Sequence, residues 1–224
     1  MDSMRGTLRK LYSENTMLKV HHLNHSRSQR IVWLLEELEL PYEIIPHQRD
    51  LETRQAPASL KEIHPLGKSP VLVDDDQVVA ESGAIIDYLT RVSKPGALRP
   101  QESSSDYNQY VFWMHYAEGS AMLPLLLALY VGSLGDAGAP LSDRISAEIN
   151  SNLDFMSAEL GDDQFFVGNT FSGADVQLTF VLEAAASRGL FDHRKNLQAY
   201  VSRMQGRAAY KRAIERGGPY HLGS

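Results

Sequence analysis

Cysteine is missing from the 224-residue sequence altogether. Its absence excludes disulfide bonds, zinc or iron–sulfur centres held by cysteine, and catalysis by a cysteine nucleophile. If the protein carries out sulfur chemistry, the thiol therefore has to arrive on another molecule.

A basic excess and a long hydrophobic run are missing as well. The sequence has 22 lysine and arginine residues against 28 aspartate and glutamate residues, and its net charge of −6 argues against nucleic-acid binding. The longest uncharged, mostly apolar run, residues 121–131, is well short of the roughly 20 residues that a membrane-spanning helix needs. We therefore expect a globular protein with no nucleic-acid or membrane partner.

Residues 1–16 contain basic residues but no apolar stretch, so they do not have the pattern of a secretory signal. Asp2 and Glu14 also depart from the acid-poor composition of an organelle-targeting segment. We expect these residues to form an N-terminal extension of a cytoplasmic protein.

Residues 17–92 alternate between strand-like and helix-like patterns. Strands are predicted over 18–23 and 42–45, and the apolar spacing of 31–40 predicts a helix between them that Pro41 ends. Parallel strands joined by a helical crossover form a βαβ unit. The segment therefore predicts the beginning of an α/β domain.

The rest of this region predicts a β-hairpin and a final helix. After a polar stretch of weak helical character, two short apolar runs flank the acidic turn at 74–76, and a helical pattern follows over 84–89. The predicted order is β-α-β-α-β-β-α, with one mixed four-stranded sheet within residues 17–92.

The composition changes after residue 92. Proline, glycine and serine predict a linker over 93–102, and residues 103–224 contain helical patterns without a convincing strand. Ser172 and Asp175 have the spacing of a capping box, which predicts the start of a helix. The second domain is therefore predicted to be all-helical, with helices over about 106–131, 142–159, 173–188, 197–205 and 207–216.

Three short segments of the first domain have residues suited to binding or catalysis. In the first, residues 24–30, a serine hydroxyl lies beside the N-terminus of the predicted helix, where free N–H groups and the helix dipole favour an anion. The same surroundings lower the pKa of a thiol held there from about 8.5 towards neutrality. The alternative is that Ser26 or Ser28 only caps the helix.

In the second segment, residues 64–72, Pro70 lies at the start of a predicted strand. Because proline donates no hydrogen bond to a neighbouring strand, it predicts an edge or a special turn, which can include a cis peptide bond. Such a turn leaves the backbone of Ser69 free to pair with an extended, peptide-like ligand. A simple turn from loop to strand is the alternative.

The third segment begins at Glu81 and Ser82, at the N-terminus of another predicted helix. Ser82 and the N–H groups that follow it make a site for a carboxylate, and Glu81 offers a partner for an ammonium group. The pair suits the amino-acid end of a zwitterionic ligand. An N-cap with an acidic neighbour, which is a common structural arrangement, is the alternative.

The order of these segments resembles the cytosolic glutathione transferase family. The stretches KVHHLNHSRSQRIVWLLEELELPYE, IHPLGKSPVLV and AESGAIIDYL are similar to the thioredoxin-like domain of that family, and the helical remainder with FSGADV is similar to its second domain. The likeness covers residues 17–216 and is to yeast-type and related bacterial transferases in particular. It implies a thioredoxin-like α/β domain followed by an all-α domain.

The resemblance also implies roles for the second and third segments. Pro70 corresponds to the family's cis-proline, and the Ser69 backbone to the group that pairs with the cysteinyl unit of glutathione. Glu81 and Ser82 would hold the γ-glutamyl end, and Lys68 is a candidate for the glycyl carboxylate. Glutathione would then be a co-substrate, with no permanently bound cofactor.

The residue that activates the thiol differs between classes of this family. Tyrosine classes place it at the end of the first strand, where this sequence has no tyrosine, and cysteine classes are excluded by composition. The sequence therefore resembles the serine classes, and counting back four positions from Arg30 gives Ser26. We expect the Ser26 hydroxyl to donate a hydrogen bond to the thiolate and so lower the thiol pKa. His25 and Asn24 are the alternates.

His21, His22 and His25 raise the question of a metal site. Neighbouring strand residues point to opposite faces, so His21 and His22 are badly placed to share one ion, and no nearby carboxylate completes the ligand set. We expect no bound metal.

Aromatic residues recur at helical spacing over 107–116. Core packing and dimer contacts explain most of this pattern. The family resemblance makes Tyr110, Trp113 and Met114 candidates for the electrophile site, and it implies a homodimer.

The leading functional hypothesis is a cytoplasmic glutathione transferase, a detoxifying enzyme that activates glutathione as a thiolate for attack on a small electrophile. The first alternative is a glutathione-dependent reductase of disulfides or peroxides, which without cysteine would use two glutathione molecules or one with the oxidant. The second is a non-catalytic interaction module, because folds are reused as binding domains.

Overall fold

The computed structural model describes residues 17–93, 96–191 and 193–222. The expected N-terminal extension, residues 1–16, and residues 94–95 of the expected linker lie outside this part of the chain. The chain divides into two compact units, of which the first joins Arg207–His221 to the chain up to Arg99 and the second includes Pro100–Gly206. None of the helices in the described ranges combines the length and apolar content that a membrane crossing requires.

A four-stranded mixed sheet forms the centre of the first unit. Its strands are β1 (Leu18–Leu23), β2 (Tyr42–His47), β3 (Val71–Asp74) and β4 (Gln77–Ala80). Their order is β2-β1-β3-β4, with β1 parallel to β2 and the other two pairings antiparallel. The predicted βαβ unit and hairpin are therefore confirmed.

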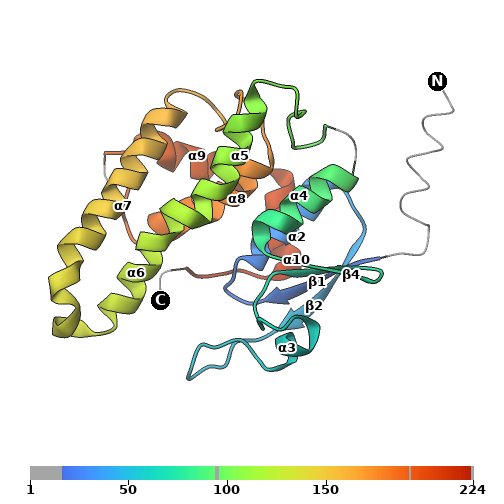
Figure 1. Ribbon diagram of the computed structural model, residues 1–224, viewed down its shortest axis with the longest axis horizontal. Coiled ribbons are helices and arrows are strands. Elements are labelled where there is room, and N and C mark those ends of the chain that lie inside the picture. Colours follow the sequence, from blue (N-terminus) through green and yellow to red (C-terminus); the bar gives the residue numbers. More distant parts are fainter. Residues whose placement is uncertain (1–16, 94–95, 192, 223–224) are drawn as a thin grey trace. The chain divides into compact units, whose positions relative to one another are not determined.

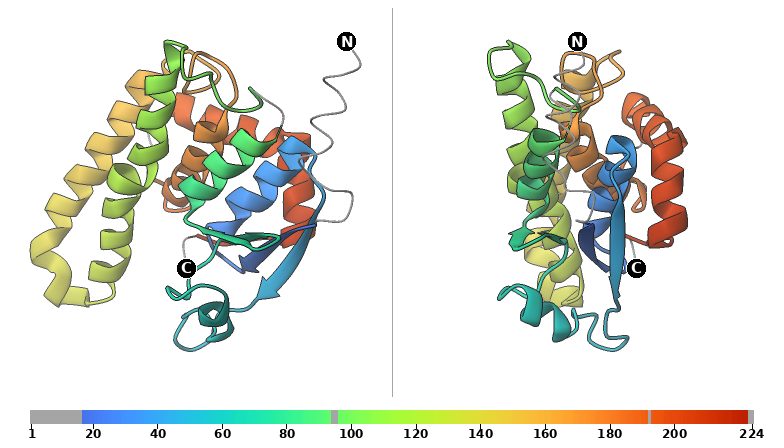
Figure 2. Two further views of the ribbon diagram at one scale, coloured as in Figure 1. Left: turned by 45° about the vertical axis from the view of Figure 1, so that its right-hand side comes forward. Right: turned by 90° about the vertical axis from the view of Figure 1, so that its right-hand side faces the viewer.

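Three helices of the first unit connect or follow these strands. Helices α2 (Ser28–Leu38) and α4 (Ser82–Val92) cover one face of the sheet, and the short α3 (Ser59–Ile63) lies on the other side (Figures 1 and 2). Helix α2 begins three residues earlier than the sequence predicts and ends before Pro41, where Glu39 has a left-handed φ of 54°. Its apolar stripe is buried as predicted.

Helix α10 (Ala208–Gly217) belongs to the first unit, although its position in the sequence predicts it within the second domain, residues 103–224. Its small apolar face packs against α2, with the Tyr210 ring 5.2 Å from the Trp33 ring. The Arg207 guanidinium pairs with the Glu37 carboxylate at 2.6 Å, and two further arginines of α10 pair with Glu36. These contacts join segments about 170 residues apart, which local patterns do not reveal.

The described residues of the second unit form helices and no strand, as the sequence predicts. The helix predicted over 106–131 is divided by a single π-helical turn that contains Gly119. The helical segments are α5 (Asp106–Tyr116), η1 (Ala117–Ala121), α6 (Met122–Gly132), η2 (Gly135–Gly138), α7 (Ala139–Leu160), α8 (Gly173–Ala186) and α9 (Lys195–Gly206).

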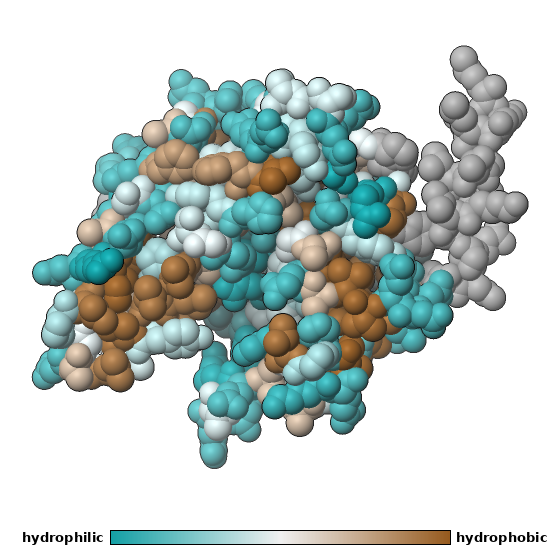
Figure 3. Space-filling view, in the orientation of Figure 1, coloured by the Kyte–Doolittle hydropathy of each residue, from teal (hydrophilic) through white to brown (hydrophobic). Residues whose placement is uncertain are grey.

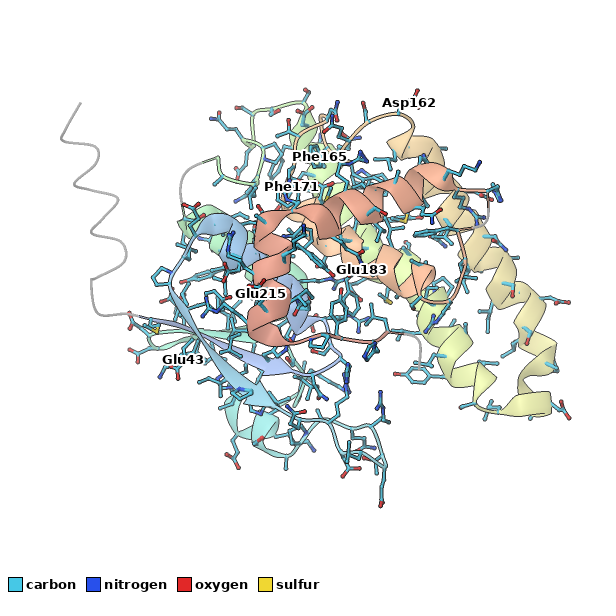
Figure 4. All side chains as sticks on the ribbon, turned by 180° about the vertical axis from the view of Figure 1, so that it is seen from behind. Glu43, Asp162, Phe165, Phe171, Glu183 and Glu215 are labelled. Carbon is cyan, nitrogen blue, oxygen red and sulfur yellow. The ribbon has the colours of Figure 1, made fainter. Side chains whose placement is uncertain are left out.

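Helix α8 is the central helix of the second unit, and nearly all of its side chains are buried. The predicted capping box is present at its start: the Ser172 hydroxyl accepts the Ala174 N–H, and the Asp175 carboxylate accepts the Ser172 N–H at 2.9 Å. Just before the cap, the Phe171 ring lies 5.7 Å from the Phe165 ring (Figure 4). Local sequence therefore fixes the start of the core helix.

Candidate functional site

The loop between β1 and α2 holds the three candidates for contact with a thiol. Asn24 is engaged on both its backbone and its side chain: its N–H donates to the His47 carbonyl, and its Oδ1 accepts the Arg49 N–H at 2.8 Å. These bonds fasten the loop to the chain that follows β2. The Asn24 side-chain oxygen thus has a structural partner.

His25 has a left-handed backbone, with φ of 51°. Its ring stacks on the His221 ring with centroids 5.5 Å apart, and its Nδ1 accepts the His221 N–H at 3.0 Å. Burial lowers the pKa of His25, and the positive charges of His221, Arg54 and Arg49 lower it further. Because Nδ1 acts as an acceptor, the ring is neutral in this arrangement.

Ser26 lies at the amino end of α2 and is only 6% exposed. Its Oγ accepts the Ser28 N–H at 3.2 Å, so it satisfies one of the free amide groups of the first helical turn. The same Oγ is 2.8 Å from the Ser28 Oγ. Although Arg27 is the N-cap of α2, the Ser26 hydroxyl binds an N–H of the first turn and lies where the helix dipole favours an anion, so a structural and a binding role for this segment are compatible.

The turn before β3 contains the expected cis peptide bond, between Ser69 and Pro70. Because β3 is an interior strand, a special turn and not an edge accounts for the proline. The Ser69 hydroxyl donates to the His21 carbonyl at 2.8 Å and accepts the Leu23 N–H at 3.2 Å. The turn is thereby attached to the end of β1, while the Lys68 side chain is exposed beside it.

Ser82 opens α4 with its side chain buried to 4% exposure, and its hydroxyl has no hydrogen-bond partner among the described residues. Glu81, the residue before it, is exposed and has a positive φ of 73°. Buried polar groups are nearly always hydrogen-bonded. A buried, unpartnered hydroxyl at a helix N-terminus is therefore suited to an anionic group supplied by a ligand.

The three candidates for the electrophile site lie on α5, in the second unit. Tyr110 and Trp113 are buried and Met114 is half-buried. The Trp113 ring packs with neighbouring rings of this unit, Phe112, Tyr116, Phe155 and Phe166, at centroid distances of 4.8 to 5.7 Å. Most of this aromatic run therefore serves as core, in agreement with its periodicity.

From the sequence, His22 and Ser28 are only a possible metal ligand and a possible helix cap, whereas the structure places both of them behind Ser26. The His22 Nδ1 lies 2.9 Å from the Ser28 Oγ, and the His22 Nε2 lies 3.0 Å from the Gly217 carbonyl oxygen. The only sequence signal was a second serine two positions after the first. His21, whose ring bonds to His47 at 3.0 Å, has different partners, and the described residues hold no cluster of three side chains suited to a metal.

The fold and the site define a thioredoxin-like α/β unit with a cis-proline before its third strand, followed by an all-α unit. The model of the glutathione S-transferase N-terminal domain matches residues 15–91, and that of the C-terminal domain matches residues 115–208. The chain belongs to the glutathione S-transferase family and is a glutathione transferase. The expected fold class is thereby confirmed.

Two fungal proteins and a bacterial structure illustrate the likeness. The chain is 35% identical to Glutathione S-transferase 3 of Schizosaccharomyces pombe, covering 89% of this chain and 88% of the relative. It is 34% identical to Glutathione S-transferase 1 of Saccharomyces cerevisiae, and the match covers 77% of this chain and 82% of that protein. A crystal structure of a glutathione S-transferase from Actinobacillus pleuropneumoniae superimposes with a TM-score of 0.83 at 32% identity, covering 92% and 94%.

Proposed function

We propose that Ser26 stabilises the thiolate of bound glutathione, which then attacks a small electrophile. The observation that carries this proposal is the position of the Ser26 hydroxyl at the amino end of α2, with a second hydroxyl directly behind it. The two alternates have other partners, since Asn24 holds Arg49 and His25 accepts from His221.

A hydrogen bond donated to sulfur acts on the thiol equilibrium. It stabilises the charged form and so lowers the pKa of the thiol, and the dipole of α2 acts in the same direction. Each unit by which the pKa falls below the ordinary value of about 8.5 corresponds to about 1.4 kcal/mol in favour of the thiolate. At neutral pH, even a shift of two units makes the nucleophile the major species.

The remainder of glutathione binds to the first unit in this proposal. Ser82 and the N–H groups that follow it hold the γ-glutamyl carboxylate, and Glu81 accepts from the ammonium group. The Ser69 backbone before Pro70 pairs with the cysteinyl unit, and Lys68 faces the glycyl carboxylate. The unpartnered Ser82 hydroxyl supports this arrangement because a ligand carboxylate supplies the partner it lacks.

The experiment that tests the function is a titration of bound glutathione. The ultraviolet absorbance of the thiolate is followed against pH at saturating enzyme, with free glutathione as the reference. We expect the bound thiol to titrate at least one unit below the free value of about 8.5. An unshifted titration of bound glutathione would contradict thiolate stabilisation by this site.

Ser82→Ala is expected to weaken glutathione binding about 10- to 100-fold, since a hydrogen bond to a charged group contributes about 1.5–3 kcal/mol. The free protein loses almost no stability, because the hydroxyl has no partner there. Titration calorimetry with glutathione and urea unfolding of the free protein measure the two effects. Ser93→Ala, which removes another buried hydroxyl without a partner from the end of the same helix, is the matched control and should leave binding unchanged.

The proposal includes the remaining partners of the reaction. Tyr110, Trp113 and Met114 are proposed to contact the electrophile, and of these only the half-buried Met114 has appreciable exposed surface. Glutathione is the co-substrate, no permanent cofactor is required, and the cytoplasm is the proposed location.

We also propose a homodimer. Helix α6 supports it with a strip of exposed apolar side chains, which is visible as a brown patch over α6 in Figure 3 and which a second copy would cover. The strip consists of Leu123, Leu127, Leu129 and Tyr130.

A further inference from the structure

We propose that His22 accepts, through Ser28 and Ser26, the proton that the glutathione thiol loses on binding. This inference rests on the proposed role of Ser26 and deepens it. Ser28 and His22 are positioning residues in this scheme, because neither contacts the sulfur. The three side chains form one continuous chain of hydrogen bonds that leads from the loop into the interior of the first unit.

The donor and acceptor of each hydrogen bond follow from the last bond of the series, between His22 and Gly217. The Gly217 carbonyl oxygen can only accept, so the His22 Nε2, 3.0 Å away, must carry a hydrogen. In a neutral ring the Nδ1 is then an acceptor, and the Ser28 hydroxyl, 2.9 Å away, donates to it. The hydroxyl has two other acceptors within reach, the Leu23 carbonyl at 3.2 Å and the Ser26 Oγ at 2.8 Å, but donation to either would leave the buried His22 Nδ1 without a hydrogen.

This assignment leaves the Ser28 oxygen as an acceptor. It receives the Leu23 N–H at 3.2 Å and the Ser26 hydroxyl hydrogen at 2.8 Å. Before glutathione binds, Ser26 therefore points its hydrogen inward and presents a lone pair outward. A thiol S–H is the complementary donor for that lone pair, whereas a thiolate is not.

The proton transfer then balances atom by atom. The thiol proton moves to the Ser26 Oγ, the former Ser26 proton moves to the Ser28 Oγ, and the former Ser28 proton moves to the His22 Nδ1. The products are a glutathione thiolate and a His22 imidazolium, and every hydroxyl keeps one hydrogen. The Ser26 hydrogen now points outward and donates to the sulfur anion, which is the bond that the proposed function requires.

The surroundings of His22 allow both protonation states. Burial lowers its pKa, the Gly217 carbonyl raises it, and the charge of His47 lowers it; the net lowering favours a neutral ring before glutathione binds. Gly217 is the last residue of α10, whose dipole favours a cation at that end. The thiolate formed next to Ser26, at the other end of the hydrogen-bonded series, supplies the opposite charge that holds the proton on the ring.

A second acceptor lies beside the ring. Gln29 is 2% exposed, and neither atom of its amide has a hydrogen-bond partner among the described residues. A Cβ atom at position 217 would lie 3.0 Å from the Gln29 Oε1 and 3.3 Å from the His22 Cε1, so both side chains approach this glycine closely. The carbonyl end of Gln29 therefore adds a negative partial charge near the imidazolium.

The test compares the thiolate formed with the protons released to solvent. Glutathione is mixed with the protein in weakly buffered neutral solution, thiolate is measured by ultraviolet absorbance, and released protons by an indicator dye. We expect clearly fewer than one proton released per thiolate in the wild-type protein. The ring nitrogen resonances of His22, observed by nuclear magnetic resonance, should change from those of a neutral to those of a protonated imidazole.

Two variants interrupt the series of hydrogen bonds from Ser26 to His22 at different points. His22→Gln retains a polar side chain that does not take up a proton, and Ser28→Ala removes the link to Ser26. Both are expected to release one proton per thiolate and to raise the pKa of the bound thiol by about one unit or more. His21→Gln is the matched control on the same strand, because its ring bonds to His47 and has no contact with Ser26, and it should keep the wild-type ratio.

The outcomes separate this inference from the proposed function. If Ser26→Ala raises the thiol pKa while the wild-type protein releases one proton per thiolate and His22 stays neutral, the relay is wrong and the role of Ser26 stands. If Ser26→Ala leaves the thiol pKa unchanged, both fail. The resonance of His22 in the wild-type protein decides the question even if Ser28→Ala unfolds because it loses the bond to Leu23.

Discussion

Asp175→Ala is expected to lower the free energy of unfolding of the helical unit by about 4 kcal/mol, because buried donors left without an acceptor cost about 1–3 kcal/mol each. The Asp175 carboxylate accepts from the Ser172 N–H at 2.9 Å, the Tyr200 hydroxyl at 2.9 Å and the Phe166 N–H at 3.2 Å. The carboxylate is fully buried, so water does not replace it. Its loss therefore affects the cap of α8, the preceding loop and α9 together.

Urea unfolding of the second unit at neutral pH measures this loss. Ser172→Ala is the graded control, because it removes the cap hydroxyl but keeps the carboxylate, and its cost should be about 1 kcal/mol. A cost for Asp175→Ala no larger than that of Ser172→Ala would mean that the carboxylate contributes only through the cap.

The charge of Asp175 has a separate signature in the pH dependence of stability. Burial raises its pKa to about 6, although the N–H and hydroxyl groups around it oppose the shift. A carboxyl of the unfolded chain titrates near 3.9, so the folded state binds the proton more tightly. The wild-type protein should therefore lose stability relative to Asp175→Asn as the pH rises from about 4 to about 6.

Local patterns were sufficient to predict most of the fold. The stripe of α2, the hairpin around 74–76 and the capping box at Ser172 depend on residues within a few positions of one another, so the sequence alone determines them. The sequence predicts one helix over 106–131, whereas the structure divides it with a π-helical turn at Ala117–Ala121.

Contacts between distant segments account for what was missed. The placement of α10 depends on the pairing of Arg207 with Glu37, and the partner of His25 is His221. The surroundings of His22 depend in the same way on Gly217, 195 positions along the chain. Periodicity showed that neighbouring histidines face opposite sides of a strand, but it gave no information on which distant carbonyl each would meet.

Ser26→Ala is expected to raise the pKa of the bound glutathione thiol by about one to two units, because a hydrogen bond to a charged group contributes about 1.5–3 kcal/mol and each unit is worth about 1.4 kcal/mol. The affinity for glutathione should change little, since its two ends are proposed to bind at other residues of the first unit. The substitution should therefore lower kcat and shift the pH profile without weakening glutathione binding.

The pH dependence of kcat/KM for an aryl halide distinguishes this role from a structural one. Below the wild-type thiol pKa, the variant should be about 10 to 100 times slower than wild type, because each unit by which the pKa is raised reduces the thiolate fraction there about tenfold. Above the raised pKa both proteins hold thiolate, so their rates should converge. A misfolded loop would instead lower the rate equally at every pH. Asn24→Ala and His25→Ala are the controls from the same loop, and a shifted profile in either of them would transfer the role of Ser26 to that residue.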